Sequence, residues 1–288
     1  MNKGRKYESF IILAAILWGI IGISVTGLSS MGISRVGIVF VRSMVAFLTL
    51  GVYLLIKDRS VFKIRIRDLW CFFGTGVVSL MFFNLCYFTA MRETSLAISA
   101  ILLYTSPAFV MILSAILFKE KITTHKTVSL IFMFVGCVLV TGVFNSENKV
   151  SVLGILCGLG SGFGYALYSI FSRFAINKGY KSETISFYTF AFAGFGSGFF
   201  ADAAEISQAI SMSFLAYALL IGVICCTLPY IFYTKGMEGT DNGKASVLAM
   251  AEPLVAAVVS VFLDGVPSIY RIIGMIIMLG AILYINKI

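Results

Sequence analysis

The chain has 288 residues, of which 59% are hydrophobic and 12% are charged, and its formal net charge is +9. Soluble globular domains carry about 25% charged residues, so the composition excludes an ordinary soluble protein. The basic residues fall in short segments between apolar runs, without a separate basic domain or a nucleic-acid-binding motif. The charge therefore predicts contact with an anionic membrane leaflet and not with nucleic acid.

Long apolar runs follow one another along the chain, and each can cross the roughly 30 Å core of a bilayer as a helix. In chain order they cover residues 9–29, 35–56, 69–90, 96–118, 127–144, 152–176, 184–201, 214–234, 245–263 and 268–285. The segments between them are too short to form a soluble domain. The sequence therefore predicts an all-α integral membrane protein in which ten transmembrane helices form one membrane domain.

Two stretches of the chain, 87–117 and 233–263, resemble each other after a shift of 146 positions. The shift places Pro107 on Pro253. A proline inside an apolar helix is costly, so a matched pair indicates a shared structural use. Internal repeats of this size are typical of transporters whose solute site lies between the two halves.

The repeat divides the spans into two parts, 1–146 and 147–288, with five spans in each. Because five is odd, the second part must enter the membrane from the opposite side, which predicts two inverted five-helix repeats. With the N-terminus inside, 17 of the 22 basic residues lie in cytoplasmic segments and four in external ones. The positive-inside rule therefore predicts that both termini are cytoplasmic.

Residues that commonly bind metals or catalyse reactions are scarce in this chain. The six cysteines form no Cys-x-x-Cys pair, and the single histidine, His125, lies in a basic loop without other ligands nearby. No phosphate-binding Walker motif is present to use ATP. We therefore expect no metal, no cofactor and no enzymatic activity, and a carrier driven by the gradient of its solute or by protons.

A set of short motifs runs through almost the whole chain. They read ILWG at 16–19, FVRS at 40–43, YTSP at 104–107, LFKEKIT at 117–123, VGCVL at 135–139, GYALY at 164–168, AEPL at 251–254 and LGAIL at 279–283. In this order and spacing they resemble the EamA-type ten-span members of the drug/metabolite transporter superfamily. One departure is that the ninth span ends in FLDGVP at 262–267, without the glycine–glutamate pair usual in the family, so that either Asp264 substitutes for the glutamate or this corner is a different turn.

The resemblance implies where a solute would bind. Spans 1–4 and 6–9 would surround a central cavity, with spans 5 and 10 at the periphery and the site near mid-membrane at the seam between the halves. Polar and aromatic residues near the middle of the surrounding spans are then the candidate substrate-binding residues. They are Trp18, Asn84, Tyr104, Ser106, Tyr165, Tyr168, Ser169, Tyr188, Tyr230, Met250 and Glu252.

Two ionisable residues, Glu252 and Arg42, lie well inside predicted spans. A charge at the centre of a membrane helix costs roughly 2.5–3.5 kcal/mol on the insertion scale, so such residues are functional by default. The two could pair across the seam. Three roles stay open for Glu252: binding a substrate amine, carrying the coupling proton, or holding a structural hydrogen bond beside the kink at Pro253.

Together these features predict a secondary transporter that moves a small organic metabolite by alternating access. The resemblance favours export of an amino acid or related amphipathic solute across the cytoplasmic membrane of a bacterium or archaeon. One alternative is a multidrug exporter, although span 1 lacks the acid on which the small four-span members of the superfamily rely. A remote one is an intramembrane enzyme or lipid-handling protein, although the spans contain no histidine. Substrate, direction, coupling ion and a homodimeric state stay open.

Overall fold

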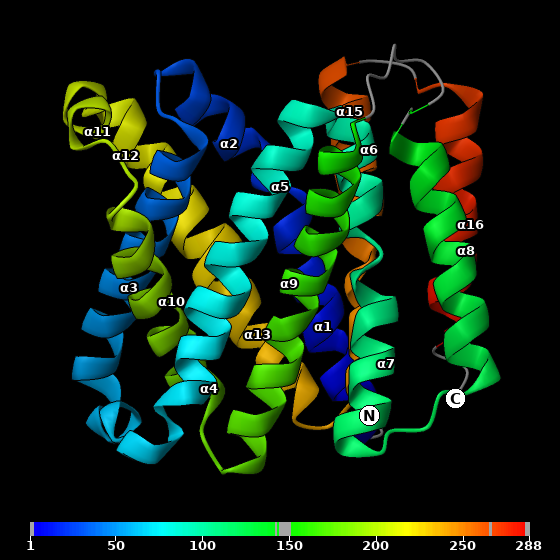
Figure 1. The fold of residues 1–288 in the computed structure, drawn as a ribbon, viewed down its shortest axis with the longest axis horizontal. Coiled ribbons are helices and arrows are strands. Elements are labelled where there is room, and N and C mark those ends of the chain that lie inside the picture. Colours follow the sequence, from blue (N-terminus) through cyan, green and yellow to red (C-terminus); the bar gives the residue numbers. More distant parts are fainter. Residues whose placement is uncertain (1–2, 142, 144–150, 265–266, 286–288) are drawn as a thin grey trace.

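The computed structural model describes residues 3–141, 143, 151–264 and 267–285, which form a bundle of helices without a strand (Figure 1). Eight helical stretches are long and apolar enough to cross a membrane, namely Arg5–Ser30, Arg35–Lys57, Ile66–Glu93, Leu96–Phe118, Thr124–Thr141, Val152–Asn177, Met212–Met237 and Asn242–Phe262. Predicted spans seven and ten correspond to two helices of 17 residues each, α10 (Ser182–Gly198) and α16 (Ile269–Ile285). The prediction of an all-α integral membrane protein is thus confirmed.

Some predicted spans are single helices and others are stacked helical pieces. Besides α10 and α16, the single helices are α3 (Arg35–Lys57), α8 (Thr124–Thr141) and α9 (Val152–Asn177). In the first half, the interrupted spans are the first, α1 (Lys3–Gly19) with α2 (Ile21–Ser30); the third, α4 (Leu69–Phe73) with η3 (Gly74–Met81) and α5 (Phe82–Glu93); and the fourth, α6 (Leu96–Leu103) with α7 (Ser106–Phe118). In the second half, they are the eighth, α12 (Met212–Leu219) with η5 (Leu220–Thr227) and α13 (Leu228–Met237), and the ninth, α14 (Asn242–Ala249) with α15 (Ala251–Asp264). The connections contain η1 (Arg59–Phe62), η2 (Ile66–Asp68) and α11 (Ala203–Ala209).

The interruptions fall at corresponding places after a shift of 146 residues. The π-helical segments η3 and η5 occupy matching positions in the third and eighth spans. The helix is broken again at Tyr104 between α6 and α7, and at Met250 between α14 and α15. Paired interruptions of apolar helices mark the solute site in many transporters, and π-helical turns often lie at functional sites. The fold therefore directs attention to the region around these breaks.

The helices are arranged so that α8 and α16 lie side by side at one edge of the bundle (Figure 1). A Cβ added at Gly136 of α8 would lie 2.9 Å from the backbone oxygen of Gly274 of α16, so the two helices approach closely. Helix α1 begins, and α16 ends, at the same end of the bundle (Figure 1). We call this the terminal end, and the other the opposite end.

Gly162 lies where α9 crosses the end of α6. A Cβ there would lie 2.9 Å from the carbonyl oxygen of Leu102 and 3.2 Å from that of Leu103, and backbone cannot yield without separating the helices. We expect Gly162→Ala to lower the free energy of unfolding by about 1–3 kcal/mol, the usual cost of overpacking. Thermal unfolding in detergent measures this. Gly160→Ala is the control, because its nearest neighbour would be Cys86 Sγ at 3.4 Å, and equal losses would contradict the prediction.

Candidate functional site

Glu252 lies in a small chamber beside the helix breaks. It belongs to the first turn of α15, and its Oε1 lies 3.5 Å from the hydroxyl of Tyr104, which lies in the break between α6 and α7. The chamber is lined by Tyr104, Ser106, Pro107, Val110, Tyr165, Ser169, Tyr233, Ser246, Ala249, Met250 and Glu252. Its free volume is about 10 Å³, which holds roughly one water molecule. In this conformation the chamber is therefore closed around the carboxylate.

The carboxylate of Glu252 is weakly held. Among the described residues its hydrogen bonds are limited to the contact with Tyr104, and 3.5 Å is at the outer limit for such a bond. An acid that served only to fix the helix kink would be expected to have firm hydrogen-bond partners, since a buried polar group without them is destabilising. The weak contact therefore favours an acid that is available to a ligand or a proton.

An aromatic chamber adjoins the acid. It is lined by Trp18, Ser79, Leu80, Tyr165, Tyr168, Ser169, Tyr230 and Tyr233. Tyr165, Ser169 and Tyr233 line both chambers, so the two are neighbours. The geometry brings apolar ring faces and one carboxylate together, which suits a solute with an apolar part and a basic group.

Trp18 is the centre of this aromatic cluster and is 6% exposed. Its ring centroid lies 6.5 Å from that of Tyr165, 5.3 Å from that of Tyr230 and 5.5 Å from that of Tyr233. Edge-to-face and tilted pairs at these distances are attractive beyond simple burial. Trp18 therefore forms the packed wall of the chamber.

Hydrogen bonds between helices fix the polar ends of the aromatic cluster. The hydroxyl groups of Tyr168 and Thr234 lie 2.8 Å apart, as do those of Ser169 and Tyr233. Both pairs connect α9 to α13. The hydroxyl groups of Tyr168 and Tyr233 are therefore already partnered, and it is the rings of these two tyrosines that can form walls of the aromatic chamber.

A wider cavity lies toward the opposite end of the bundle. It has a volume of about 440 Å³ and is lined by Ser95, Leu96, Ala97, Ala100, Tyr104, Val140, Thr141, Pro253, Ala256, Ala257, Ser260 and Arg271. Tyr104 belongs both to this cavity and to the chamber of Glu252. Tyr104 therefore lies between the wider cavity, which we call the vestibule, and the chamber of Glu252.

Arg42 and Glu252 have separate partners. Arg42 Nη2 donates a hydrogen bond of 3.2 Å to Asn84 Oδ1, and Arg42 Nε is buried without a hydrogen-bond partner. The ion pairs among the described residues do not include one between Arg42 and Glu252. The pair that the sequence allowed across the seam is therefore not made in this conformation, because Arg42 contacts Asn84 of α5 whereas Glu252 contacts Tyr104.

Most of the candidate residues come together, but two do not join the chambers. Asn84 instead lines a separate small pocket with α3 and α10, next to Arg42. The hydroxyl of Tyr188 donates to the carbonyl oxygen of Phe62 at 2.8 Å and thereby fastens α10 to η1. Sequence reasoning overlooked Tyr233, which lines both chambers. Its position three residues after Tyr230, on one face of a helix, was the available signal.

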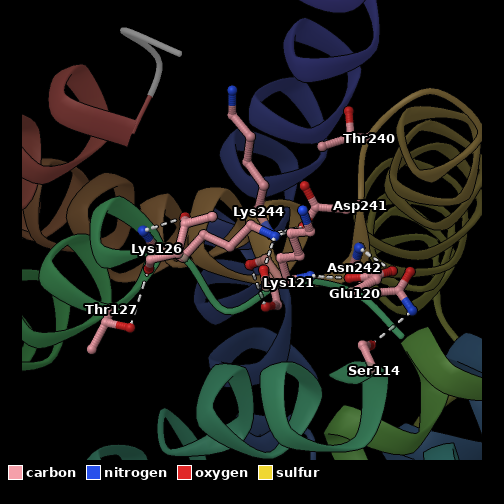
Figure 2. Close-up of polar contacts among 12 residues, drawn as sticks. Ser114, Glu120, Lys121, Lys126, Thr127, Thr240, Asp241, Asn242 and Lys244 are labelled. Carbon is pink, nitrogen blue, oxygen red and sulfur yellow. Dashed lines mark hydrogen bonds and ion pairs between the residues drawn. The ribbon is translucent and has the colours of Figure 1, made fainter. Parts of the chain in front are cut away.

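A polar network surrounds the start of α14 at the terminal end of the bundle (Figure 2). Asn242, the first residue of α14, is completely buried. Its Nδ2 donates to Ser114 Oγ at 3.0 Å, and its Oδ1 accepts from Arg173 Nε at 2.7 Å. Glu120 Oε1 accepts from the Asn242 backbone N–H at 3.1 Å, and Oε2 accepts from that of Gly243 at 3.3 Å. We call these contacts the Asn242 network.

Apolar helices that enclose an acid and a cluster of aromatic rings beside paired helix breaks define a membrane transporter. The model of the EamA-like transporter family matches residues 5–142 and again residues 152–287, and the chain belongs to this family. The protein is accordingly a transporter and not an enzyme.

Relatives of similar length support the same class. An uncharacterised transporter of Archaeoglobus fulgidus is 26% identical over 97% of this chain and 96% of its own. The uncharacterised transporter YwfM of Bacillus subtilis is 24% identical over 91% and 87%, and the uncharacterised inner membrane transporter YicL of Salmonella typhimurium is 24% identical over 99% and 97%. One solved crystal structure shares the fold, with a TM-score of 0.80 at 17% identity over 98% of this chain and 96% of its own.

Proposed function

We propose that this transporter is a secondary carrier that moves a small amphipathic metabolite, an amino acid or a related amine, through the chamber of Glu252 by alternating access. The observation that carries the proposal is the weakly bonded carboxylate, which faces Tyr104 at the helix breaks and adjoins the aromatic chamber. A carboxylate binds an amine, and ring faces attract both the amine and apolar groups. Because the closed chamber has room only for water, the solute enters when the helices around it move apart.

We further propose that the two halves, 1–146 and 147–288, are inverted repeats that move against each other. Three observations support this. The helix breaks correspond after 146 residues, one family model matches both halves, and the first helix begins at the end of the bundle where the last one ends (Figure 1). The distribution of basic residues supports a cytoplasmic terminal end. Export is the direction that the family resemblance favours.

The orientation can be tested with single cysteines in a chain whose own six cysteines are replaced. Ser60, in η1, and Ser207, in α11, are both exposed. We expect a cysteine at Ser207 to react with a membrane-impermeant thiol reagent applied to intact cells, and a cysteine at Ser60 to react only after the membrane is opened. The reverse pattern would contradict a cytoplasmic terminal end, and labelling of both in intact cells would contradict the proposed topology.

The transported solute can be sought by comparing cells that express the intact protein with cells that express the Glu252→Gln variant. We expect a metabolite with an amine and an apolar part to accumulate outside only in the first culture, and the same compound to raise the melting temperature of the purified intact protein. Identical metabolite profiles, inside and outside, would contradict the proposal.

The same chamber also fits the multidrug alternative, because one carboxylate beside ring faces attracts many lipophilic cations. Resistance to several unrelated cations, without a change in any metabolite, would favour that reading. Accumulation of one metabolite without drug resistance would favour the metabolite carrier.

A further inference from the structure

The Asn242 network joins the two halves of the chain. Ser114 and Glu120 belong to the first half, and Asn242 belongs to the second. Ser114 Oγ accepts from Asn242 Nδ2 at 3.0 Å, and Glu120 Oε1 accepts from the Asn242 backbone N–H at 3.1 Å. Glu120 follows Lys119, whose φ of 58° turns the chain sharply after α7 and directs the carboxylate toward α14. A carboxylate that accepts two backbone N–H groups at a helix start is a strong, charge-assisted cap.

Two ion pairs reinforce this contact on either side. Lys126 Nζ of α8 lies 2.7 Å from Asp241 Oδ1, and Lys244 Nζ of α14 lies 2.7 Å from Glu8 Oε1 of α1. Both pairs again connect the first half to the second, and both lysine side chains are only 12–13% exposed. Figure 2 shows Lys126, Asp241 and Lys244 gathered around the start of α14. Polar contacts therefore fasten the start of α14 to the first half at the terminal end.

The equivalent helix start at the opposite end lies beside a cavity. Residue Ser95 caps α6, and it stands 146 positions before Asp241, which caps α14 in the same way. In the part of the chain that the structure describes, the side-chain cap of the first turn of α6 is local, because the backbone N–H of Ile98 donates to Ser95 Oγ at 3.2 Å. Ser95 and Leu96 line the 440 Å³ vestibule. One helix start is thus capped by the other half, whereas its counterpart faces a cavity.

Helix α14 links the network to the solute chamber. It begins at Asn242 and is only eight residues long. Ser246 and Ala249 from this helix, and Met250 directly after it, line the chamber of Glu252. A displacement of the start of α14 is therefore transmitted within two helical turns to the chamber wall.

We propose that Glu120 and Asn242 are positioning residues of the transport cycle, which hold α14 against the first half and keep the path from the chamber to the terminal end closed. The inference rests on the proposed alternating access. The bonds of Glu120 must break when the carrier opens at the terminal end, and the vestibule at the opposite end closes in the same step. The described conformation is the one in which the contacts of the Asn242 network are made.

The test measures the accessibility of single cysteines to a small methanethiosulfonate reagent in the detergent-purified protein, so that no solute is needed. A cysteine at Ser246 reports on the path behind Asn242, and one at Ala100 reports on the vestibule. We expect Glu120→Gln to raise the reaction rate at Ser246 about tenfold, because a neutral acceptor binds the two N–H groups less strongly, and to lower the rate at Ala100.

The opposed changes are the readout that a purely structural role would not give. If Glu120 only stabilised the fold, its loss would raise both rates together, and that result would overturn the proposal, as would two unchanged rates. Glu183→Gln is the matched control: it removes a carboxylate at the same end, in the first turn of α10 and outside the network, and should leave both rates unchanged.

If the Glu120→Gln variant does not fold, a second variant tests the same proposal. Ser114→Ala is nearly isosteric and removes only the acceptor of the Asn242 Nδ2 hydrogen bond. We expect the same opposed changes with smaller amplitude, and parallel or absent changes would again refute the assignment. Since no solute takes part, failure here is distinguishable from failure of the proposed transport function, which the metabolite comparison tests separately.

Discussion

Replacement of Glu252 by glutamine should reduce transport by tenfold or more while the bundle stays folded. Glutamine keeps the size of the side chain and can still contact the hydroxyl of Tyr104, but it loses the negative charge to which we assign the binding of an amine. Hydrogen bonds to charged groups contribute about 1.5–3 kcal/mol, which corresponds to roughly one to two powers of ten in affinity. Because removal of a charge from the membrane interior is favourable, the melting temperature should be equal or higher.

The variant is best measured in proteoliposomes loaded with the solute that the metabolite comparison identifies. Weakened solute binding at every pH supports a bond between Glu252 and the amine. Loss of pH-driven accumulation with exchange preserved would instead make Glu252 the proton carrier. Nearly normal transport with a lowered melting temperature would mean a structural role and would contradict the proposed site. Glu93→Gln, at the end of α5, is the matched control because it lies outside both chambers.

Any dependence of the transport rate on pH in this experiment is not expected to come from Asp58, the acid directly after α3. The hydrogen bond from Lys181 lowers the pKa of Asp58 to about 2. A lowered pKa keeps the carboxylate ionised at every pH above that value. Asp58 therefore keeps its charge between pH 5 and pH 8, and a change in transport over this range needs another group.

Replacement of Trp18 by alanine should destabilise the protein strongly. The side chain is 6% exposed and has three aromatic neighbours with centroids 5.3 to 6.5 Å away. Truncation of a buried tryptophan to alanine typically costs about 3–5 kcal/mol. We expect a large drop in melting temperature together with loss of transport, and Trp18→Phe should recover much of both because it keeps an aromatic ring in the cluster.

Tyr165 should behave differently, although sequence reasoning treated it and Trp18 alike. Tyr165 is only partly buried and its ring lines both chambers. Tyr165→Ala should therefore lower transport with a smaller loss of stability than Trp18→Ala. Thermal unfolding and transport measured on the same preparations would show this. Normal transport by Tyr165→Ala would mean that its ring is not a wall of the solute path.

The sequence alone determined the class of the protein and the approximate position of each span. Both follow from local properties, because the length of an apolar run and the charges that flank it decide whether a helix crosses the membrane. Glu252 could be identified for the same reason, since an acid within an apolar run is visible without knowledge of its neighbours. The matched prolines, Pro107 and Pro253, likewise indicated the helix breaks beside which the chamber lies.

The tertiary structure decided which residues face one another. Tyr104 meets Glu252 across 148 positions, Arg42 contacts Asn84 instead of Glu252, and Tyr188 points to the backbone of Phe62. In a soluble protein the polar side of a helix shows which face is buried, but membrane helices are apolar toward both lipid and protein. The sequence pattern therefore does not show how each helix is rotated, and only the packing of the bundle placed Tyr233 in the chamber and Glu120 at the start of α14.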